Sequence, residues 1–233
     1  MQDEVPGLLD ALPYGGLDHR FRKQMDEKKL DRISYALGLS MGNNFRASGI
    51  QTLNVGDFAD GVAAVFDGSQ PKMTYDEAKA EIQKFFTAME AEQKAQAAKI
   101  GEANEAEGKA FLEKNGQRAE VKTTPSGLQY EVLQEGNGQS PAPEDQVEVH
   151  YTGTLLDGTK FDSSVDRGVP ATFGVTQVIP GWVEALQLMK EGDKWRLFIP
   201  SQLAYGPAGT PGGPIGPNQT LLFDVELIKV YKK

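Results

Sequence analysis

The stretch that decides the fold runs from Gln146 to Phe223 and carries three short signatures, VHYTG at 149–153, VIPGW at 178–182 and LAYG at 203–206. An Asp-Gly pair at 157–158 and the segment FDSS at 161–164 lie between the first two. A hydrolase would carry a nucleophile and a base in such signatures, whereas aromatic and aliphatic residues recur at those places here. The stretch therefore predicts an apolar binding cleft.

Apolar and polar residues alternate within and around these signatures, which is the pattern of half-buried antiparallel strands. The alternating sets lie at 128–132, 147–153, 195–199 and 221–227. The Asp-Gly pair is typical of a hairpin turn. One short helix is expected near 181–189, with Trp182, Leu186 and Met189 on one face. A small sheet with one helix packed on it is an α+β arrangement.

The region before the sheet has helical periodicity instead. One apolar stripe is formed by Leu30, Ile33, Leu37, Met41 and Phe45, and a second short apolar helix follows over 55–66. Two short helices cannot enclose a core alone. They pack either on the third helix of the same chain or on a second subunit, and the length of the stripe favours a second subunit.

A third, long helix is expected to begin at a capping box, Thr74 to Glu77, and to run to about Asn115. About 40 residues at about 1.5 Å each would span roughly 60 Å. After Glu90 the helix is polar on all sides, which is typical of a helix that bridges domains through solvent. No apolar heptad seam continues there, so a coiled coil is disfavoured. Gly101 and Gly108 are expected bending points, because each weakens a helix by about 1 kcal/mol relative to Ala.

The predicted organisation has four parts. Residues 1–27 lack sustained periodicity and are expected to be a flexible extension. Residues 28–73 form a helical dimerisation region, 74–118 a long connecting helix, and 119–233 the α+β domain.

The composition excludes several function classes. The chain has 233 residues, a net charge of −9 and no cysteine. An acidic chain of this kind is unsuited to general nucleic-acid binding or to an anionic membrane surface. The lack of cysteine excludes disulfides, thiolate zinc sites and cysteine nucleophiles. With only two histidines, His19 and His150, neither a metal nor a cofactor is expected.

The chain shows no sign of a membrane span or of a signal peptide. No apolar run approaches the roughly 20 residues of a membrane span. The acidic start, MQDE, lacks the basic start and apolar core of a signal peptide. A cytoplasmic location is therefore expected. The alternative is a periplasmic or outer-surface location, if a signal peptide was removed.

The cleft has an acidic residue but no evident acid–base pair. Asp162 and Arg167 could form an ion pair at its rim, where the Tyr151 hydroxyl could also donate to Asp162. No second acidic residue is placed to partner Asp162, and His150 falls on the outward, solvated face. Phe173 and Phe223 are as well suited to the core as to a pocket. The Gly- and Pro-rich loop at 205–217 lacks the GK[ST] end of a phosphate loop, and its length favours a binding loop.

These residues carry a family resemblance. The segment from about Gly127 to Val230 resembles an FKBP-type peptidyl-prolyl cis–trans isomerase domain, through YTG at 151–153, FDSS at 161–164, VIPGW at 178–182, AYG at 204–206 and TLLFDVEL at 220–227. The N-terminal helices resemble the bacterial Mip/FkpA/FklB-like branch, through SYALG at 34–38, GV at 61–62 and GKAFL at 108–112.

The resemblance implies a half-wrapped, five-stranded antiparallel sheet around a short helix, with the proline pocket between them. It implies catalytic contacts from Tyr151, Phe161, Asp162, Ile179, Trp182, Tyr205 and Phe223. It implies further substrate contacts from Arg167, Phe173, Val178 and Ile215. Trp182 is expected as the floor under the prolyl ring, and Tyr205 and the Ile179 backbone N–H as donors to peptide carbonyls.

The sequence also departs from the family pattern. Gln177 stands where many members have Glu, Thr210 stands where some have His, and an extra Gly lies near Gly213. These departures bear on inhibitor affinity and on sequence preference.

The function implied is a homodimeric isomerase with chaperone activity that acts on proline-containing unfolded or partly folded polypeptides. Its pocket could also bind macrolide inhibitors. The main alternative is a receptor that grips proline segments without turnover, and retention of the catalytic set favours the enzyme. A scaffold that acts through its helices alone would leave the filled cleft motif unexplained. An apolar pocket suits the reaction, because stripping water from the ground-state amide favours the less polar twisted form, and no proton transfer is needed.

Overall fold

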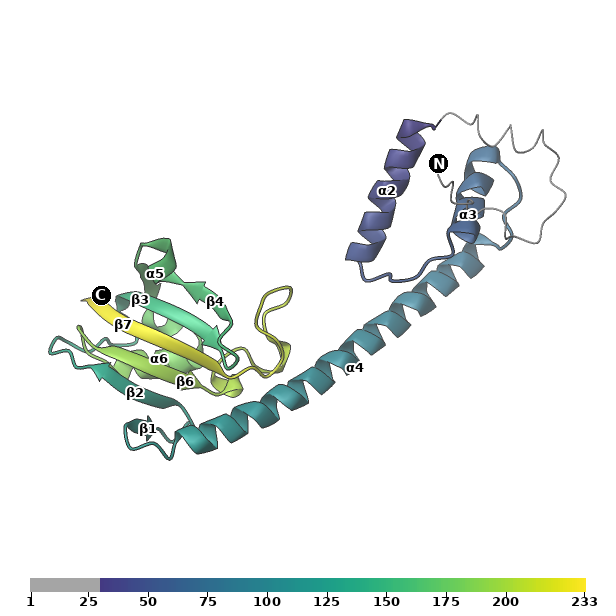
Figure 1. Cartoon of the computed structure of the whole chain (residues 1–233). Coiled ribbons are helices and arrows are strands. Elements are labelled where there is room, and N and C mark those ends of the chain that lie inside the picture. The colour runs from purple at the N-terminus through teal and green to yellow at the C-terminus, as the bar shows by residue number, and fades with distance from the viewer. Residues whose placement is uncertain (1–29) are drawn as a thin grey trace, which may run out of the picture. The chain divides into compact units, whose positions relative to one another are not determined.

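The structure is a computed structural model that describes residues 30–233. The extension expected over 1–27 lies outside the described residues. The chain divides into two compact units between Glu77 and Ala78, and Figure 1 traces the elements of each. The four-part organisation stays a prediction, while the helical N-terminal region, the long helix and the α+β domain are all present.

The first unit contains two helices, α2 (Arg32–Ala47) and α3 (Val55–Asp67). Asp31 caps α2 by accepting from the backbone N–H groups of Ile33 and Ser34, and Asn54 caps α3 in the same way. The ring of Phe45 meets that of Phe58 edge-on, with centroids 5.5 Å apart. Neither helix contains a buried residue. Leu37 of α2 and Val65 of α3, for example, are both exposed.

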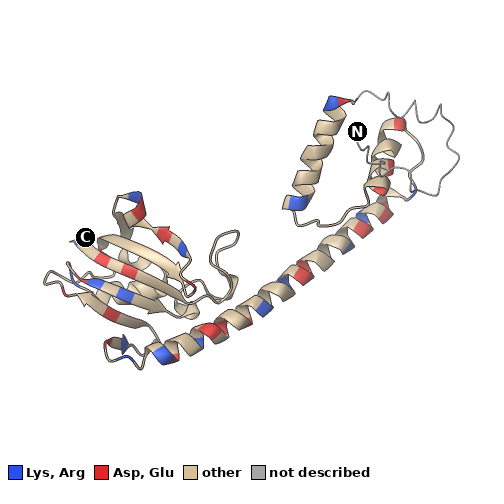
Figure 2. Cartoon of the chain, viewed as in Figure 1, with Lys and Arg blue, Asp and Glu red and all other residues tan. Residues whose placement is uncertain are grey.

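The long helix α4 runs over Tyr75–Asn115. The predicted capping box is confirmed: the backbone N–H of Thr74 donates to Glu77 at 2.8 Å, and that of Glu77 donates to Thr74 Oγ1 at 3.2 Å. Acidic and basic residues are interspersed along the helix (Figure 2). Residues 91–100 are exposed on every side. Among residues 30–233, no helix combines the length and the apolarity needed to cross a membrane.

Bending at Gly101 and Gly108 stays a prediction, but both glycines are buried against the sheet domain. A Cβ at Gly108 would lie 2.2 Å from Thr220 Oγ1, and one at Gly101 would lie 3.1 Å from Asn218 Nδ2. The helix is assigned without interruption through both positions. The lack of a side chain at Gly101 and Gly108 allows Asn218 and Thr220 to lie close to the helix backbone.

The second unit is built on an antiparallel sheet in the order β1-β2-β6-β7-β3-β4, with β5 also paired to β3. The strands are β1 (Val121–Thr123), β2 (Gln129–Gln134), β3 (Gln146–Leu155), β4 (Lys160–Ser163), β5 (Ala171–Gly174), β6 (Lys194–Ile199) and β7 (Leu221–Tyr231). The sheet has seven strands instead of the implied five. The short β1 extends one edge, and β4 and β5 pair with successive parts of β3 at 152–154 and 146–149.

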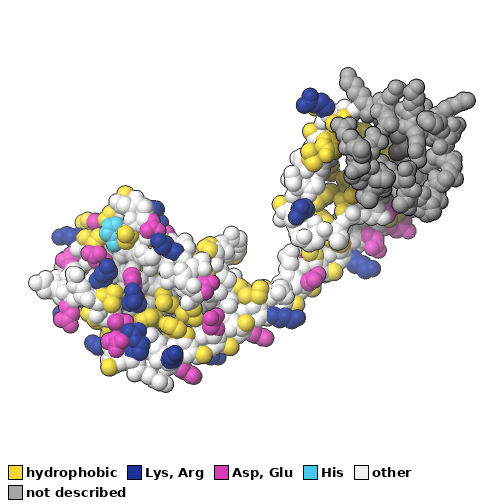
Figure 3. Space-filling view, in the orientation of Figure 1, with side chains coloured by type: hydrophobic (Ala, Val, Ile, Leu, Met, Phe, Trp, Pro, Cys, Tyr) yellow, Lys and Arg dark blue, Asp and Glu magenta, His cyan; other side chains and the backbone are white. Residues whose placement is uncertain are grey.

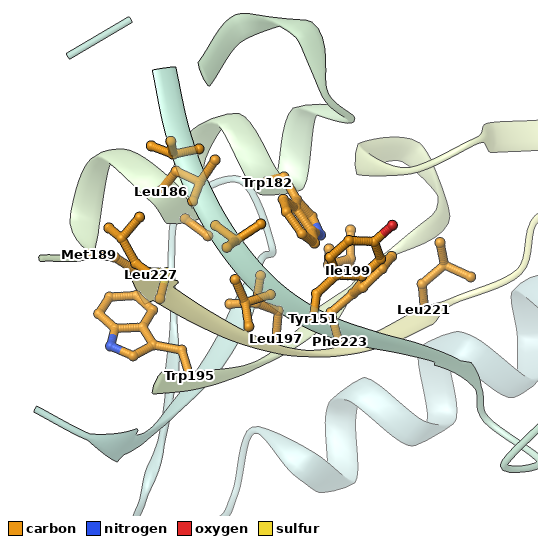
Figure 4. Packing of buried hydrophobic residues seen from close by; sticks show 14 of the residues in the cluster. Tyr151, Trp182, Leu186, Met189, Trp195, Leu197, Ile199, Leu221, Phe223 and Leu227 are labelled. Carbon is orange, nitrogen blue, oxygen red and sulfur yellow. The ribbon is translucent and has the colours of Figure 1, made fainter. Parts of the chain in front are cut away.

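Helix α6 (Pro180–Leu188) packs on one face of this sheet and buries Trp182, Ala185 and Leu186. Figure 4 shows Trp182 and Leu186 of α6 over side chains from β3, β6 and β7. Short helical turns join the strands: α5 (Ser164–Arg167), η1 (Val175–Gln177), η2 (Ser201–Leu203) and η3 (Gly206–Ala208). The alternation along β3, β6 and β7 places their apolar side chains on the face that α6 covers.

The last turns of α4 pack against the sheet domain. The rings of Phe111 and Phe198 lie 5.9 Å apart. Asn115 Nδ2 donates to Gln129 Oε1 at 2.9 Å, and Gln129 Nε2 donates to the backbone oxygen of Leu112 at 2.8 Å. Because Phe198 lies between Leu197 and Ile199, its side chain is on the face of β6 opposite to the main core. The end of α4 is therefore part of the second unit.

Candidate active site

The second unit contains a pocket with a volume of about 460 Å³. Every predicted site residue except Arg167 lines it. The lining comprises Tyr151, Phe161, Asp162, Phe173, Gln177, Val178, Ile179, Trp182, Tyr205, Ile215 and Phe223. These residues come from β3, β4, β5, η1, β7, the start of α6 and the loops after β6. Positions spread over more than seventy residues of sequence thus converge on one apolar hollow.

Trp182 lies at the centre of an aromatic cluster and is only 4% exposed. Its ring meets those of Tyr151, Phe173 and Phe223 nearly at right angles, with centroids 5.3, 6.0 and 5.2 Å away. Phe161 meets Phe223 in the same manner at 5.4 Å. Edge-to-face contacts of this kind are the favoured geometry for aromatic rings. Phe223 is both a buried core residue and a pocket residue, which resolves the choice between the two that the sequence left open.

The start of α6 places Trp182 in the pocket lining. Pro180 occupies the first turn of the helix, where its missing N–H costs nothing. Gly181 allows the helix to lie close to the sheet, since a Cβ there would be 2.6 Å from Ile199 Cγ2. The backbone N–H of Trp182 donates to the oxygen of Ile179 at 2.9 Å. Val178 and Ile179, which precede α6, also line the pocket.

Asp162 is engaged on both carboxylate oxygens. The Tyr151 hydroxyl donates to Oδ2 at 2.5 Å, and Arg167 donates to Oδ1. Arg167 also donates to the Tyr151 hydroxyl at 3.1 Å, so it supports the pocket without lining it. Partial burial opposes ionisation of Asp162, but the hydrogen bonds from Tyr151 and Arg167 outweigh it and lower its pKa. Burial, together with the neighbouring carboxylate, raises the pKa of Tyr151.

Two serines of the FDSS segment, Ser163 and Ser164, support Tyr151 and Arg167 through hydrogen bonds. The buried Ser164 hydroxyl accepts from the backbone N–H of Tyr151 at 2.8 Å and lies 3.0 Å from His150 Nδ1. Ser163 caps α5 by accepting from the Asp166 N–H at 3.2 Å, and α5 carries Arg167. His150 was expected in solvent, yet it is half-buried. The alternation of β3 indicates its face correctly but not that Ser164 would lie beside it.

Two residues at the pocket mouth differ in exposure. Tyr205 is 41% exposed, whereas Ile215 is 5% exposed. Gln177 also lines the pocket, although the sequence marked it only as a departure from the family pattern. Its position directly before Val178 was the signal that could have identified it. Within residues 30–233, no three His, Asp or Glu side chains gather closely enough to hold a metal ion.

Comparison with known proteins gives matches over both units. The family model described as "FKBP-type peptidyl-prolyl cis-trans isomerase" matches residues 137–228. The model described as "Domain amino terminal to FKBP-type peptidyl-prolyl isomerase" matches residues 30–132. Together these two models account for most of the chain that the structure describes.

Relatives of similar length match most of the chain. "Outer membrane protein MIP" of Legionella longbeachae is 46% identical over 87% of this chain and 86% of that protein. "Peptidyl-prolyl cis-trans isomerase Mip" of Coxiella burnetii is 42% identical over 98% of both. The crystal structure of FkpA from Escherichia coli is similar at a TM-score of 0.68 and 41% identity, over 88% of this chain and 98% of that one. The name of the Legionella relative refers to the outer membrane, so the cytoplasmic expectation gains no support.

Proposed function

Since this chain belongs to the FKBP-type peptidyl-prolyl cis–trans isomerases, in the branch with an N-terminal helical domain, we propose that its aromatic pocket binds a prolyl residue and promotes rotation about the preceding amide bond. The observation that carries this assignment is the pocket itself. Trp182 and the three aromatic rings that stand edge-on to it line this pocket. Asp162, whose two carboxylate oxygens both accept hydrogen bonds, also lines it.

The mechanism proposed is desolvation with shape selection. Rotation about a peptide bond faces a barrier of about 18–20 kcal/mol, which reflects amide resonance. The planar amide is more polar than the twisted one, so removing water destabilises the ground state more than the transition state. Walls that fit the twisted prolyl ring add binding that exists only in the transition state. The rings of Phe161, Phe173 and Phe223 around Trp182 supply such walls.

The polar groups of the pocket would orient the peptide. Tyr205, which is exposed, and the backbone N–H of Ile179, directly before α6, would donate to peptide carbonyls. Asp162, fixed by Tyr151 and Arg167, would hold the Tyr151 ring against Trp182. Val178 and Ile215 would close the sides of the prolyl site. None of these roles requires a covalent or proton-transfer step.

The N-terminal helices are proposed to dimerise and to contact clients. In a single chain, Leu37 is 61% exposed and Phe66 is 85% exposed. Figure 3 shows apolar side chains on the surface of this unit. Since two short helices without a buried residue cannot form a stable core, a second copy is the proposed cover for one face. Two pockets in one dimer would bind one unfolded client with avidity, which supports chaperone activity.

The test of the site is the rate of cis-to-trans relaxation of a Leu–Pro or Phe–Pro peptide. We expect Trp182→Leu to lower kcat/KM at least about tenfold, equivalent to about 1.4 kcal/mol of transition-state stabilisation, and Asp162→Asn to lower it less. The matched control is Asp224→Asn, which breaks an ion pair with Arg196 outside the pocket lining and should leave kcat/KM within about twofold.

Two outcomes would change the assignment. A folded Trp182→Leu variant with unchanged kcat/KM would place the isomerase site elsewhere. An intact protein that binds the peptide but does not accelerate its relaxation would favour a proline-segment receptor. Circular dichroism of each variant separates loss of activity from loss of fold.

Macrolide inhibitors are proposed to occupy the same pocket. A macrolide of the type that binds related domains should compete with the peptide and should lose affinity in the Trp182→Leu variant. Isothermal titration of both proteins measures this. Unchanged affinity in the variant would show that the inhibitor binds outside the pocket.

A location in the cell envelope is proposed in place of the cytoplasm, supported by the name of the Legionella relative. Fractionation of cells that express the full natural gene, followed by detection of the protein in cytoplasmic and envelope fractions, tests this. Recovery in the cytoplasmic fraction alone would return the assignment to the original expectation.

A further inference from the structure

The loop after Tyr205, residues 206–219, is here called the flap. It carries Ile215 into the pocket and begins beside Tyr205. Two backbone hydrogen bonds within the flap hold its ends and its tip. The N–H of Thr210 donates to the oxygen of Ile215 at 2.8 Å, and the N–H of Asn218 donates to the oxygen of Gly206 at 2.9 Å. A segment so rich in Gly and Pro therefore has a defined shape.

The flap is also joined to α4 by two side-chain amides. Asn104 Nδ2 donates to the backbone oxygen of Pro217 at 2.7 Å. Asn218 Nδ2 donates to the backbone oxygen of Gly101 at 3.3 Å. The two contacts run in opposite directions, one from the helix to the flap and one from the flap to the helix. Both asparagines are half-buried, which shields these bonds from competing water.

Gly101 makes the approach of the flap to the helix feasible. A Cβ at this position would lie 3.2 Å from Pro217 Cβ and 3.1 Å from Asn218 Nδ2, which is closer than ordinary van der Waals contact. At Gly101 the helix backbone is therefore not covered by a side chain of its own, and Pro217 and Asn218 of the flap can contact it. This accounts for a glycine in the middle of a long helix, where it would otherwise only cost stability.

Asn218 links the helix to the pocket through a single residue. Its φ of 52° makes it the one non-glycine residue of the described chain in the left-handed region, where Asn is tolerated better than most residues. Its backbone N–H is bound to Gly206, the neighbour of Tyr205, and its side chain is bound to α4. Ile215 lies two residues before Pro217, which Asn104 holds.

We propose that Asn104 and Asn218 are positioning residues of the isomerase site. They fix the flap to α4, and the flap sets how Tyr205 and Ile215 border the prolyl pocket. The helix thereby controls which residues next to proline the pocket accepts. This inference rests on the proposed function, because it concerns the same pocket, and it extends that function to a part of the chain that does not touch the substrate.

The test uses the intact protein with Asn104→Leu, which removes the amide at similar volume, and Asn218→Gly, which removes the amide and keeps the left-handed backbone accessible. The matched control is Gln96→Leu, on an exposed turn of the same helix. The kcat and KM values are measured for Ala–Pro, Glu–Pro, Leu–Pro and Phe–Pro peptides. Hydrogen exchange of residues 206–219 is measured in parallel.

We expect both variants to change the ratio of kcat/KM between Leu–Pro and Ala–Pro by about threefold to tenfold, the equivalent of one ordinary hydrogen bond. The change should appear mainly in KM, with faster exchange in the flap and an unchanged control. Unaltered ratios would overturn the proposal. So would an equal loss of rate on all four peptides, because it would indicate general destabilisation. A wild-type protein without isomerase activity would instead refute the proposed function, and the two failures are therefore distinct.

Discussion

Gly153 of β3 lies against two aromatic rings of the pocket wall, those of Phe161 and Phe223. A Cβ at this position would be 2.6 Å from two ring atoms of Phe161 and 2.7 Å from Phe223. Gly153→Ala should therefore force these two rings apart. We expect a loss of about 1–3 kcal/mol in the free energy of unfolding, as for other overpacked cores, together with a lower kcat/KM. Urea unfolding and the peptide assay measure the two effects.

Gly216→Ala provides the control for Gly153→Ala. A Cβ at Gly216 would meet nothing nearer than 3.7 Å, so the free energy of unfolding should change little. If Gly153→Ala were as stable as this control, the pocket wall would be softer than the ring geometry indicates.

The pH dependence of kcat/KM should be flat between about pH 5 and 8, the range in which an unperturbed His would titrate. The lowered pKa of Asp162 means that its stabilising contacts are complete above the ordinary carboxyl pKa of about 4 and are lost as pH falls through the lowered value. The raised pKa of Tyr151 keeps its phenol protonated up to and beyond its ordinary pKa of about 10. A bell-shaped profile with a midpoint near neutrality would contradict a site without proton transfer.

At the residue scale, the sequence predicted most of the pocket lining. It did not predict that Gln177 lines the pocket or that His150 contacts Ser164. Tyr151 and Phe223 could be placed because strand alternation assigns them to the covered face. The lining role of Gln177 and the contact between His150 and Ser164 depend on where η1 and α5 lie. A single sequence does not specify the path of such short connections.

Among the elements, α4 departs most from expectation. Its polar composition predicted a solvated helix, and residues 91–100 agree with this. The part from Gly101 onward packs against the flap and the sheet, with Phe111 against Phe198. A glycine in a polar helix has the same local pattern whether it weakens the helix or admits a neighbour. Only tertiary contacts distinguish the two cases.

A fragment that begins at residue 119 should therefore be less stable than one that begins at residue 78. The shorter fragment loses the packing of Phe111 on Phe198 and the hydrogen bond between Asn115 and Gln129. We expect a difference of about 2–5 kcal/mol, as for removal of a large apolar side chain with a polar partner. Urea unfolding of both fragments measures it. Equal midpoints and slopes would show that the helix end does not support the domain.

At the scale of the whole molecule, the two described helices of the first unit, α2 and α3, contain no buried residue. If a second copy covers it, association stabilises it by mass action. Calorimetry of the intact protein should then show a transition whose midpoint rises with protein concentration. A second transition, from the sheet domain, should not move. Sedimentation equilibrium should give a dimer.

The variant that tests this is Leu37→Glu, which places a charge on the exposed apolar face of α2. We expect a monomer that keeps its activity on short peptides and lacks the concentration-dependent transition. Gln96→Glu, on the exposed part of α4, is the control and should remain a dimer. A monomeric wild-type protein, or a dimeric Leu37→Glu variant, would contradict the model.

The engagement of both Asp162 oxygens leaves this carboxylate without a free oxygen to accept a proton. With no free base in the rate-limiting step, turnover in heavy water should proceed at nearly the rate seen in light water. A site that only lowers the rotational barrier lowers it equally from both sides. It shortens the time that a chain needs to equilibrate its prolyl bonds and leaves the equilibrium ratio unchanged. The client's own fold therefore determines which isomer accumulates.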